Sequence, residues 1–505
     1  MEKKHFNVLL VYPEFPDTFW SFKHALRFIG KKAASPPLGL LTVAALLPAD
    51  WPKKLVDLNV RALNDEDLAW ADMVMISAMI VQRESAAQVI DRCHAAGVKV
   101  VAGGPLFMGN WEQFDKVDTF VLNEAESTLP EFLKDLESGE TRRVYTSGEF
   151  PDIRQSPVPL WQLLDLHQYN SMSVQFSRGC PYNCEFCNVT AMFGRKPRTK
   201  TTAQVIAELN ALFSLGWRGS VFFVDDNFIG ARQQVKNGLL PALIRWRAGK
   251  MRRMSFYTQA TIDLADDDDL MHMMVEAGFR MVFIGIETPE EHSLIECGKL
   301  QNRGRDLVKS VKRIHRAGMQ VQGGFIVGFD NDPPSIFQRQ VELIQKSGIV
   351  TAMVGLLQAL PDTRLYQRLK GENRLEGGSS GDNVDGTTNI VPVMNLSVLL
   401  RGYHYILQQI YAPKAYYERI RTFLQDFQVP RLKTLIDWRS IPQYIQAFFR
   451  AIYRLGIRGV ERIQFWRIAR WTLFHRPRAF ATAITLAIYG FHFRRVYELH
   501  VQTSG

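Results

Sequence analysis

Hydrophobic positions along the chain divide it into three regions of different periodicity. Over residues 1–140, runs of nearly continuous apolar residues, such as 6–13, 72–80 and 98–105, alternate with amphipathic segments. Continuous apolar runs are typical of strands covered on both faces, and the segments between them have helical periodicity. The pattern predicts an α/β domain with a doubly wound parallel sheet. Its ligand site is then expected beyond the carboxyl ends of the strands.

A second alternating block occupies residues 171–370, after a linker over 141–170 that is rich in Pro, Gly and polar residues. The block contains six apolar strands, each followed by a crossover segment. Crossovers of one hand between parallel strands build a barrel or part of one. We predict a partial (β/α)6 TIM-type barrel with its chemistry at the carboxyl ends of the strands. The Gly-rich, polar stretch 371–394 that follows predicts a mobile loop.

Residues 395–505 lose the strand pattern and predict a helical domain rich in aromatic residues and arginine. This end of the chain also carries the excess charge. Residues 431–505 contain 13 Lys/Arg and 3 Asp/Glu, an excess equal to the net +10 of the whole chain. Basic helices of this kind bind anionic membrane surfaces or nucleic acid, or they cover a barrel mouth and display arginine to solvent.

For these basic C-terminal helices we favour contact with a membrane surface, and we do not expect nucleic acid, because the apolar stretch 479–493 offers a face for lipid. Packing over the barrel mouth stays open as the alternative. The same stretch is shorter than the ~18–20 residues that a membrane-spanning helix needs, and it contains His492. The N-terminal segment lacks the cleavage-site pattern of a secretory signal. We therefore expect a cytoplasmic protein, with peripheral contact at the inner face of the membrane.

Cysteine is scarce in the chain, and its few positions are clustered. The 505 residues, 46% hydrophobic and 22% charged, fit about three folded domains and exclude disordered, collagen-like and coiled-coil classes. Five cysteines in this length make a poor disulfide framework. Three of them, Cys180, Cys184 and Cys187, follow the first predicted barrel strand with the spacing C-x3-C-x2-C. Thiolates so spaced can bind three irons of a [4Fe-4S] cluster, whereas a structural zinc site needs a fourth ligand.

This triplet resembles the signature of the radical S-adenosylmethionine enzymes. The resemblance implies that S-adenosylmethionine binds the open iron and that its reductive cleavage gives a 5′-deoxyadenosyl radical. A reduced flavodoxin or ferredoxin-type protein would supply the electron. The resemblance also implies an aromatic residue beside the adenine, a polar residue at the ribose or methionine part, and the GxIxG pattern of the fifth strand. These positions are Phe186, Glu287, Gly324, Ile326 and Gly328.

Residues 1–140 resemble the Rossmann-like cobalamin-binding modules that are joined to many enzymes of this family. The module's DxHxxG motif, which supplies a lower axial histidine to cobalt in other cobalamin proteins, is absent, and residues 57–62 (DLNVRA) stand in its place. The resemblance therefore implies a cobalt without a histidine ligand. The alternative is a degenerate domain that only packs against the barrel. The implied cobalamin contacts are Ser77, Gly103, Gly104 and the loop acids Glu124 and Glu126.

Within this family the chain resembles the group that contains the hopanoid methylases. This resemblance rests on segments 188–201 and 224–230 and on the helical tail. It implies methylation of an unactivated carbon in a small or lipid-like substrate. One S-adenosylmethionine would methylate reduced cobalt, and a second would generate the radical that removes hydrogen. No side chain deprotonates an alkyl C–H near pH 7, so the cofactors must carry out the removal of hydrogen and the transfer of the methyl group. Two alternatives stay open: a cobalamin-dependent radical cyclase or rearrangement enzyme, and a non-enzymatic iron–sulfur scaffold or sensor.

Two further polar groups have no assigned role, and the sequence identifies no catalytic side chain. Asp225, Asp226 and Asn227 follow a predicted strand, where they could bind substrate or S-adenosylmethionine, or cap a helix. A basic loop after the third cysteine could contact the cofactor carboxylate, cover the cluster loop, or lie in solvent. Its members are Arg195, Lys196, Arg198 and Lys200.

Overall fold

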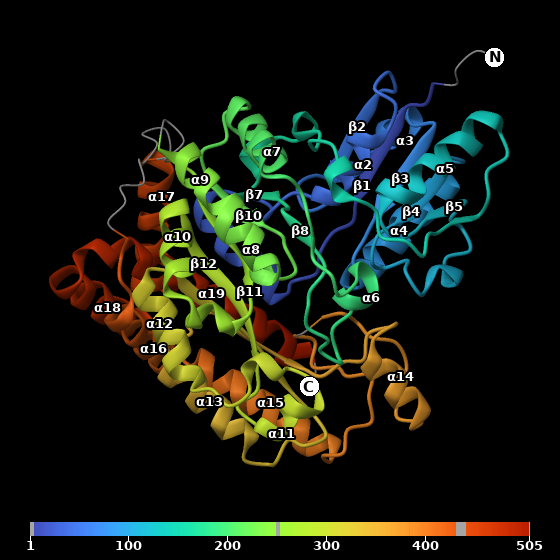
Figure 1. The fold of residues 1–505 in the computed structure, drawn as a ribbon. Coiled ribbons are helices and arrows are strands. Elements are labelled where there is room, and N and C mark those ends of the chain that lie inside the picture. Colours follow the sequence, from blue (N-terminus) through green and yellow to red (C-terminus); the bar gives the residue numbers. More distant parts are fainter. Residues whose placement is uncertain (1–4, 249–252, 383, 431–440, 504–505) are drawn as a thin grey trace.

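The computed structural model describes residues 5–248, 253–382, 384–430 and 441–503, with side chains described as far as residue 500 (Figure 1). These residues form two six-stranded parallel sheets, a two-stranded ribbon and a set of C-terminal helices. In Figure 1 the first sheet lies at the upper right in blue, the second lies to its left in green and yellow, and the C-terminal helices are orange and red.

The first sheet has the strand order β2-β1-β3-β4-β5-β6, with all neighbours parallel. Val8 and Leu10 of β1 pack with helices α2 and α5 on one face, and Leu9 and Val11 pack with α4 on the other. The predicted doubly wound sheet is confirmed, and β6 lies within residues 141–170. The elements are β1 (Val8–Tyr12), β2 (Lys53–Asp57), β3 (Met73–Ser77), β4 (Lys99–Gly103), β5 (Thr119–Val121), β6 (Val144–Tyr145), α2 (Leu38–Leu46), α3 (Asp65–Trp70), α4 (Arg83–Ala95) and α5 (Ala125–Ser138).

The second sheet runs in sequence order from β7 through β10, β11, β12 and β13 to β14, and all its pairs are parallel. Its first and last strands are edges, so the predicted partial (β/α)6 barrel is confirmed as an open one. The strands are β7 (Ser171–Val174), β10 (Ser220–Phe223), β11 (Ser255–Ala260), β12 (Phe279–Glu287), β13 (Gln320–Val327) and β14 (Ala352–Leu356). The helices are α7 (Thr202–Ser214), α8 (Arg232–Gln234), α9 (Leu240–Arg247), α10 (Asp268–Ala277), α11 (Glu291–Glu296), α12 (Leu307–Ala317), α13 (Ile336–Ser347) and α14 (Arg364–Gly371).

Helix α12 shows how local sequence sets these elements. The Asp306 side chain accepts the Lys309 backbone N–H and so caps the helix start. Val311 and Ile314 lie on the face that is buried against the sheet. The helix ends at Gly318, whose φ of +107° is a left-handed conformation that glycine adopts without a steric penalty.

The C-terminal helices form an outer layer on the barrel. Helices α15 and α16 pack on α13, and α19 packs on α16, α18 and the N-terminal helix α1. Within the described residues, no helix is both long and apolar enough to cross a bilayer. These helices are α1 (Lys23–Ile29), α15 (Leu396–Tyr411), α16 (Pro413–Asp426), α17 (Ile441–Ala451), α18 (Arg462–His475) and α19 (Phe480–Thr503), with a π-helical segment (Ile452–Ile457) after α17.

One basis of the predicted membrane contact is wrong. The stretch 479–493, expected to offer an apolar face to lipid, lies in the protein core, where Ala483 and Phe493 are fully buried. The Phe493 ring packs 5.3 Å from the ring of Phe19, and the Tyr416 hydroxyl donates to the backbone of α19. The reason is that α19 is apolar on several sides and is enclosed by neighbouring helices. The start of the basic tail, residues 431–440, lies outside the described residues.

The Gly-rich segment 371–394 is tied to the loop that follows β14. The Gln358 side chain bonds with Ser379 and Ser380, and Asn389 bonds with both backbone groups of Ala359. Position 383 within this segment lies outside the described residues. The predicted mobility of the segment stays a prediction.

Candidate active site

The three clustered cysteines lie on a loop that is closed by a short antiparallel ribbon. Strand β8 (Ser177–Arg178) pairs with β9 (Arg198–Thr199), and the loop between them also contains α6 (Val189–Phe193). Gly179, with φ of +92°, permits a close crossing, because a Cβ there would lie 2.9 Å from the Gly194 carbonyl oxygen. The Cys180 N–H donates to that same oxygen at 3.3 Å. The loop therefore presents its thiols from one compact turn.

Burial and mutual proximity mark Cys180, Cys184 and Cys187 as a group. Burial raises the pKa of each thiol, that of Cys187 to about 12. The charges of neighbouring thiols raise the pKa of Cys180 and Cys187 further, and the charge of Glu287 does so for Cys184. Within the described chain no three His, Cys, Asp or Glu side chains converge on a single metal position. A four-iron cluster needs no such point, since each thiolate binds a different iron.

The surroundings of these thiols suit a negatively charged, sulfur-rich group. The Nδ2 atom of Asn227 lies 3.9 Å from Cys180 Sγ, and Nε2 of Gln301 lies 3.9 Å from Cys184 Sγ. The positive charge of buried Lys299 lowers the pKa of all three thiols against the effect of burial. Donors and a cation aimed at thiols stabilise thiolates, which are the form that binds iron. The residues present therefore fit a [4Fe-4S] cluster.

The barrel positions predicted from the family pattern gather beside the cysteine loop. Glu287 ends β12 with φ of +63°, and its carboxylate accepts from Lys299 Nζ at 2.7 Å. Lys299 Nζ also lies 5.9 Å from the centroid of the Phe186 ring. The adjacent strand β13 supplies Gly324, where a Cβ would lie 2.8 Å from the Phe283 ring. Ile326 and Gly328 follow on that strand and at its end. Their roles toward S-adenosylmethionine stay predictions.

Asp225 and Asp226 hold the cysteine loop in place. Fully buried Asp225 accepts the Phe176 and Ser177 backbone N–H groups at 3.1 and 2.5 Å, and Asp226 accepts the Gly179 N–H at 2.9 Å. Burial raises their pKa values to about 7 and about 6, because these hydrogen bonds offset only part of the desolvation. The sequence allows both helix capping and ligand binding at these positions. The contacts observed are instead with the start of the cysteine loop.

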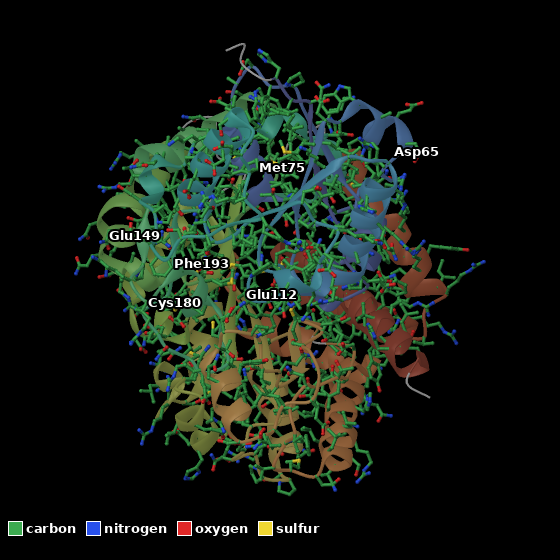
Figure 2. The ribbon with its side chains drawn as sticks, turned by 90° about the vertical axis from the view of Figure 1, so that its right-hand side faces the viewer. Asp65, Met75, Glu112, Glu149, Cys180 and Phe193 are labelled. Carbon is green, nitrogen blue, oxygen red and sulfur yellow. The ribbon has the colours of Figure 1, made fainter. Side chains whose placement is uncertain are left out.

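A cleft separates the first domain from the barrel at the carboxyl ends of the strands. It encloses about 1210 Å³ of empty space, part of it open to solvent. All five predicted cobalamin-contact residues line it: Ser77, Gly103, Gly104, Glu124 and Glu126. The opposite wall comes from the cysteine loop through Arg178 and Phe193. Figure 2 shows Phe193 and Cys180 of that loop below Met75 of the first domain.

Two glycines shape the first-domain wall of this cleft. A Cβ on Gly103 would lie 2.6 Å from the Val121 carbonyl oxygen, and one on Gly104 would lie 2.6 Å from Ser77 Oγ. Gly104 also has φ of +89°, which disfavours any larger residue. Neither position has room for a side chain, so the first-domain wall keeps its close backbone packing where the predicted cobalamin contacts lie.

The predicted acidic pair has partners inside the protein. Glu124 binds Arg178 and Arg198 at 2.6 and 2.7 Å, and Glu126 binds Arg178 at 2.8 Å and the Ser156 hydroxyl at 2.6 Å. Burial would raise the pKa of Glu126, but the Arg178 guanidinium outweighs it and holds the pKa at about 2. Both carboxylates therefore fasten the cysteine loop to the first domain. Whether Glu126 also contacts cobalamin stays a prediction.

Asn59 occupies the place where the histidine motif was expected. Its amide nitrogen donates to the Pro13 carbonyl oxygen at 3.2 Å and to Asp57 at 2.8 Å, and its oxygen accepts the Phe15 N–H at 2.9 Å. Each polar atom of this side chain is already used within the loops of the first domain. The geometry agrees with a cobalt site that lacks a ligand from this position.

The basic loop after the third cysteine divides into exposed and paired members. Arg195 and Lys196 are exposed, Arg198 joins the ion pairs with Glu124, and Lys200 pairs with Glu208 in the core. Sequence reasoning missed Lys299, Gln301 and the role of Arg178. Arg178 stands two positions before the first cysteine, a closeness that could have drawn attention to it. Lys299 and Gln301 lie more than one hundred residues further on, and no local pattern marks them.

Family descriptions match successive parts of the chain. The B12 binding domain matches residues 32–133, the Radical SAM superfamily matches 174–344, and a domain of unknown function (DUF4070) matches 363–504. An uncharacterized methyltransferase of Synechocystis sp. is 42% identical over 99% of this chain and 93% of its own length. Hopanoid C-2 methylase of Rhodopseudomonas palustris is 32% identical over 92% of this chain and 88% of its own.

Two solved structures share the fold at low sequence identity. OxsB, a cobalamin-dependent S-adenosylmethionine radical enzyme with aqua-cobalamin and S-adenosylmethionine bound, matches with a TM-score of 0.64 and 15% identity over 99% of this chain and 80% of that one. The radical S-adenosylmethionine methyltransferase TsrM of Kitasatospora setae, with cobalamin and a [4Fe-4S] cluster bound, matches with a TM-score of 0.60 and 14% identity over 98% of this chain and 100% of that one.

The fold and the two adjoining sites define a radical S-adenosylmethionine enzyme with a cobalamin-binding domain. The chain belongs to the cobalamin-dependent radical S-adenosylmethionine methyltransferase family that includes hopanoid C-2 methylase. The cofactors of this family are a [4Fe-4S] cluster, S-adenosylmethionine and cobalamin. The enzyme class, fold and cofactors predicted from the sequence are confirmed.

Proposed function

We propose that this enzyme methylates an unactivated carbon of a small or lipid-like substrate held between its first domain and its barrel. The observation that carries the proposal is a cavity that joins the two. About 720 Å³ of empty space is lined by Ser77 and Leu38 of the first domain and by Ser173 and Phe222 of the barrel strands. Because Ser77, Leu38 and Val224 also line the larger cleft, the two spaces adjoin.

The lining of this cavity supports an uncharged, largely apolar substrate. Among the described residues that form it there is no charged side chain, and the wall is dominated by Pro36, Leu40, Met79, Phe222 and Val224. Apolar walls with a few hydroxyl groups hold apolar ligands and orient them by isolated polar contacts. The name of the relative that is 32% identical, a hopanoid methylase, supports the same substrate class.

The side chains of this protein would hold and separate the reactants. When bound, the cluster supplies reductive cleavage of S-adenosylmethionine and cobalamin supplies a methyl carrier. Cys180, Cys184 and Cys187 would hold the cluster, with Lys299 offsetting its negative charge. The Glu124–Arg178 ion pair fixes the cysteine loop against the cobalamin domain. The apolar cavity wall would limit the contact of a bound substrate with water, which protects a reactive substrate from side reactions.

We propose a reduced flavodoxin or ferredoxin-type protein as electron donor and the cytoplasm as the place of reaction, next to the inner face of the membrane. The test is anaerobic reconstitution with iron, sulfide and hydroxocobalamin, followed by reduction with flavodoxin. The reconstituted protein then receives methyl-deuterated S-adenosylmethionine and a total lipid extract as the substrate probe. Mass spectrometry should find S-adenosylhomocysteine, 5′-deoxyadenosine and a lipid that carries the label.

Two controls separate this proposal from its alternatives. Without cobalamin, 5′-deoxyadenosine should still form while the label fails to reach lipid, and Cys184→Ala should lose both products. An altered lipid that carries no label, formed together with 5′-deoxyadenosine, would instead identify a radical cyclase or rearrangement enzyme. A protein that binds its cluster and forms no 5′-deoxyadenosine under reduction would be a scaffold or sensor.

A further inference from the structure

Exposed apolar side chains are concentrated in one short part of the C-terminal helical layer. Of the 22 large apolar side chains exposed in the described residues, 11 lie between residues 441 and 474. Phe449, Val460, Ile463 and Phe474 are between 63% and 79% exposed. Isolated exposed apolar residues are ordinary, but a contiguous set of them marks an interaction surface. We call these 11 side chains the docking face. They lie along α17, the π-helical segment and α18.

The docking face follows helical periodicity. Ile441, Ile445, Phe449, Tyr453 and Ile457 recur every four residues and point away from the core. On the opposite side of the same helix the residues are small or aliphatic and buried: Ala447, Ala451 and Leu455. A helix that buries one apolar face in the core and exposes a second one to solvent is stabilised further when another surface covers the exposed face.

The same face is cationic. Exposed Arg458, Arg462 and Arg470 lie among the apolar residues, and in the described part of the chain none of them has an acidic side chain within ion-pair distance. Within residues 441–478 the one acidic residue is Glu461, which is buried and paired with Arg494 at 2.8 Å. The docking face therefore combines guanidinium groups that have no acidic partner in the described residues, one of them (Arg458) 4.9 Å from the centroid of the Tyr453 ring, with protruding aliphatic and aromatic side chains.

We propose that the docking face binds the surface of an anionic lipid bilayer, with its apolar side chains in the headgroup region and its arginines on lipid phosphates. The substrate class named above would be met at such a surface, and to that extent the inference rests on the proposed function. The charge of the face is complementary to anionic lipid. A second copy of the chain would place arginine against arginine, and nucleic acid would leave side chains such as Phe474 without an apolar partner.

The docking face is fixed relative to the rest of the enzyme. Gln443 Nε2 donates to the Ile29 carbonyl oxygen at 2.6 Å, and Arg450 donates to the Arg27 and Phe28 carbonyl oxygens at 3.2 and 3.1 Å. These contacts join α17 to the end of α1, from which the chain continues into the cleft wall at α2. Binding at the docking face would therefore hold the cleft in one orientation to the bilayer.

The test is co-sedimentation of the full-length protein with vesicles of phosphatidylcholine, with or without phosphatidylglycerol. We expect binding to the anionic vesicles that weakens with salt and is at least tenfold weaker to the neutral ones. The variant Arg458→Gln/Arg462→Gln/Arg470→Gln should lose on the order of a hundredfold in affinity, at about fivefold for each cation. The variant Phe449→Ser/Ile457→Ser/Phe474→Ser should lose at least tenfold on the same vesicles.

A control with the same change in charge uses exposed cations elsewhere, Lys116→Gln/Arg143→Gln/Lys346→Gln, and it should bind as the wild type does. Circular dichroism checks that each variant is folded. Equal loss in this control and in the arginine variant, or a wild type that sediments equally with neutral vesicles, would overturn the proposal. So would a dimer of the wild type, detected by ultracentrifugation, that the serine variant dissociates. None of these measurements needs methyl transfer, so they stand or fail independently of the proposed function.

Discussion

Nη1 of Arg178 lies 2.6 Å from Oε2 of Glu124, and this ion pair joins the cysteine loop to the domain on the other side of the cleft. Its side chains are only 12% and 3% exposed. Arg198 binds the second oxygen of Glu124 from the opposite strand of the ribbon, at 2.7 Å. A buried carboxylate held by two guanidinium groups restrains the cysteine loop, so this contact helps to fix the loop relative to the first domain.

Replacement of Arg178 by Gln should therefore lower the stability of the protein. It should also weaken the coupling between S-adenosylmethionine cleavage and methyl transfer. The change removes a cation from two buried carboxylates, Glu124 and Glu126, a loss of about 3–5 kcal/mol in the free energy of unfolding. We expect 5′-deoxyadenosine to form with less methyl transfer for each molecule cleaved, measured by mass spectrometry. Arg154→Gln, which breaks an exposed pair with Asp152, should leave the free energy of unfolding close to that of the wild type, because solvent screens an exposed pair. An equal loss in the free energy of unfolding in the two variants would contradict this account.

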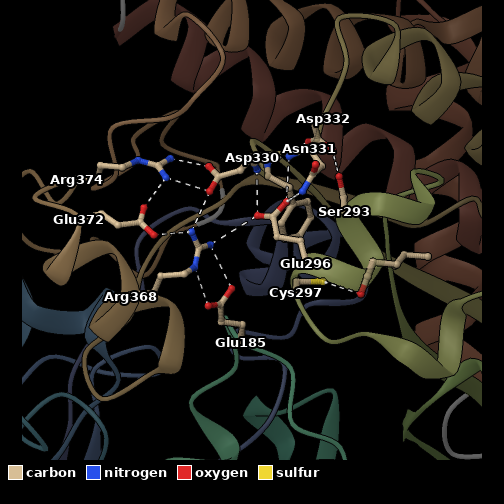
Figure 3. Close-up of polar contacts among 12 residues, drawn as sticks. Glu185, Ser293, Glu296, Cys297, Asp330, Asn331, Asp332, Arg368, Glu372 and Arg374 are labelled. Carbon is tan, nitrogen blue, oxygen red and sulfur yellow. Dashed lines mark hydrogen bonds and ion pairs between the residues drawn. The ribbon is translucent and has the colours of Figure 1, made fainter.

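Arg368 fastens the cysteine loop from its other side. Figure 3 shows its guanidinium between Glu185, which lies next to Cys184, and Asp330, at 2.8 and 2.9 Å. Arg368→Gln should lower the iron bound after reconstitution by several-fold, because the loop loses an anchor. Arg374→Gln is the matched control, since Arg374 binds Asp330 and Glu372 but does not contact the loop. If both variants lose iron equally, the ion-pair network stabilises the region as a whole instead of the cysteine loop.

Asn227 should tune the cluster through its contact with Cys180 Sγ. A donor to a cluster sulfur favours the reduced, more negative state. Asn227→Leu should therefore lower the reduction potential, as measured by EPR-monitored titration, and reduce activity by about 10–100-fold. Asn237→Leu, an exposed position nearby in the sequence, serves as the control. A potential that is unchanged in Asn227→Leu would remove Asn227 from this role.

Gly104 should be the most sensitive position of the cleft wall. Gly104→Ala places a methyl group against Ser77 Oγ at a left-handed φ, so it should destabilise the protein by about 1–3 kcal/mol and weaken cobalamin binding. Gly39→Ala lines the same cleft, but its added methyl group meets no atom within 4 Å. It should leave the cobalamin-free protein as stable as the wild type in urea unfolding. Equal destabilisation by the two changes would show that backbone strain at Gly104 is not the cause.

Asp332 gives a pH dependence that can be isolated. Burial raises its pKa to about 6, although Ser293 and the Gly328 and Phe329 N–H groups donate to it. The native carboxyl thus keeps its proton at pH values where the unfolded one has lost it. Its contribution to stability is largest below about pH 4 and declines by about 2–3 kcal/mol as the pH rises to about 6. Between about pH 4 and 6 the free energy of unfolding in urea should fall by about 2–3 kcal/mol more in the wild type than in Asp332→Asn, because Asp225 and Asp226 titrate in both proteins. Equal declines in the two proteins would refute this.

The sequence by itself determined the fold class and singled out the three cysteines that are predicted to bind the cluster. Strand and helix periodicity is a local property, so alternating apolar runs were sufficient to predict both parallel sheets. The three cysteines lie within eight positions, and their spacing on one loop needs no tertiary information. Gly104 was identified from a family pattern, and the structure adds its physical reason, the absence of room for a side chain beside Ser77.

Only the tertiary structure decided which groups are partners and which surfaces are free. Glu124 and Arg178 are 54 residues apart, and no local pattern indicates that the first would be neutralised by the second. The stretches 441–474 and 479–493 are both rich in large apolar residues, yet the second is enclosed by α1, α16 and α18 while the first keeps 11 of its large apolar side chains exposed. Exposure depends on which neighbours cover a helix face, and those neighbours come from distant parts of the chain.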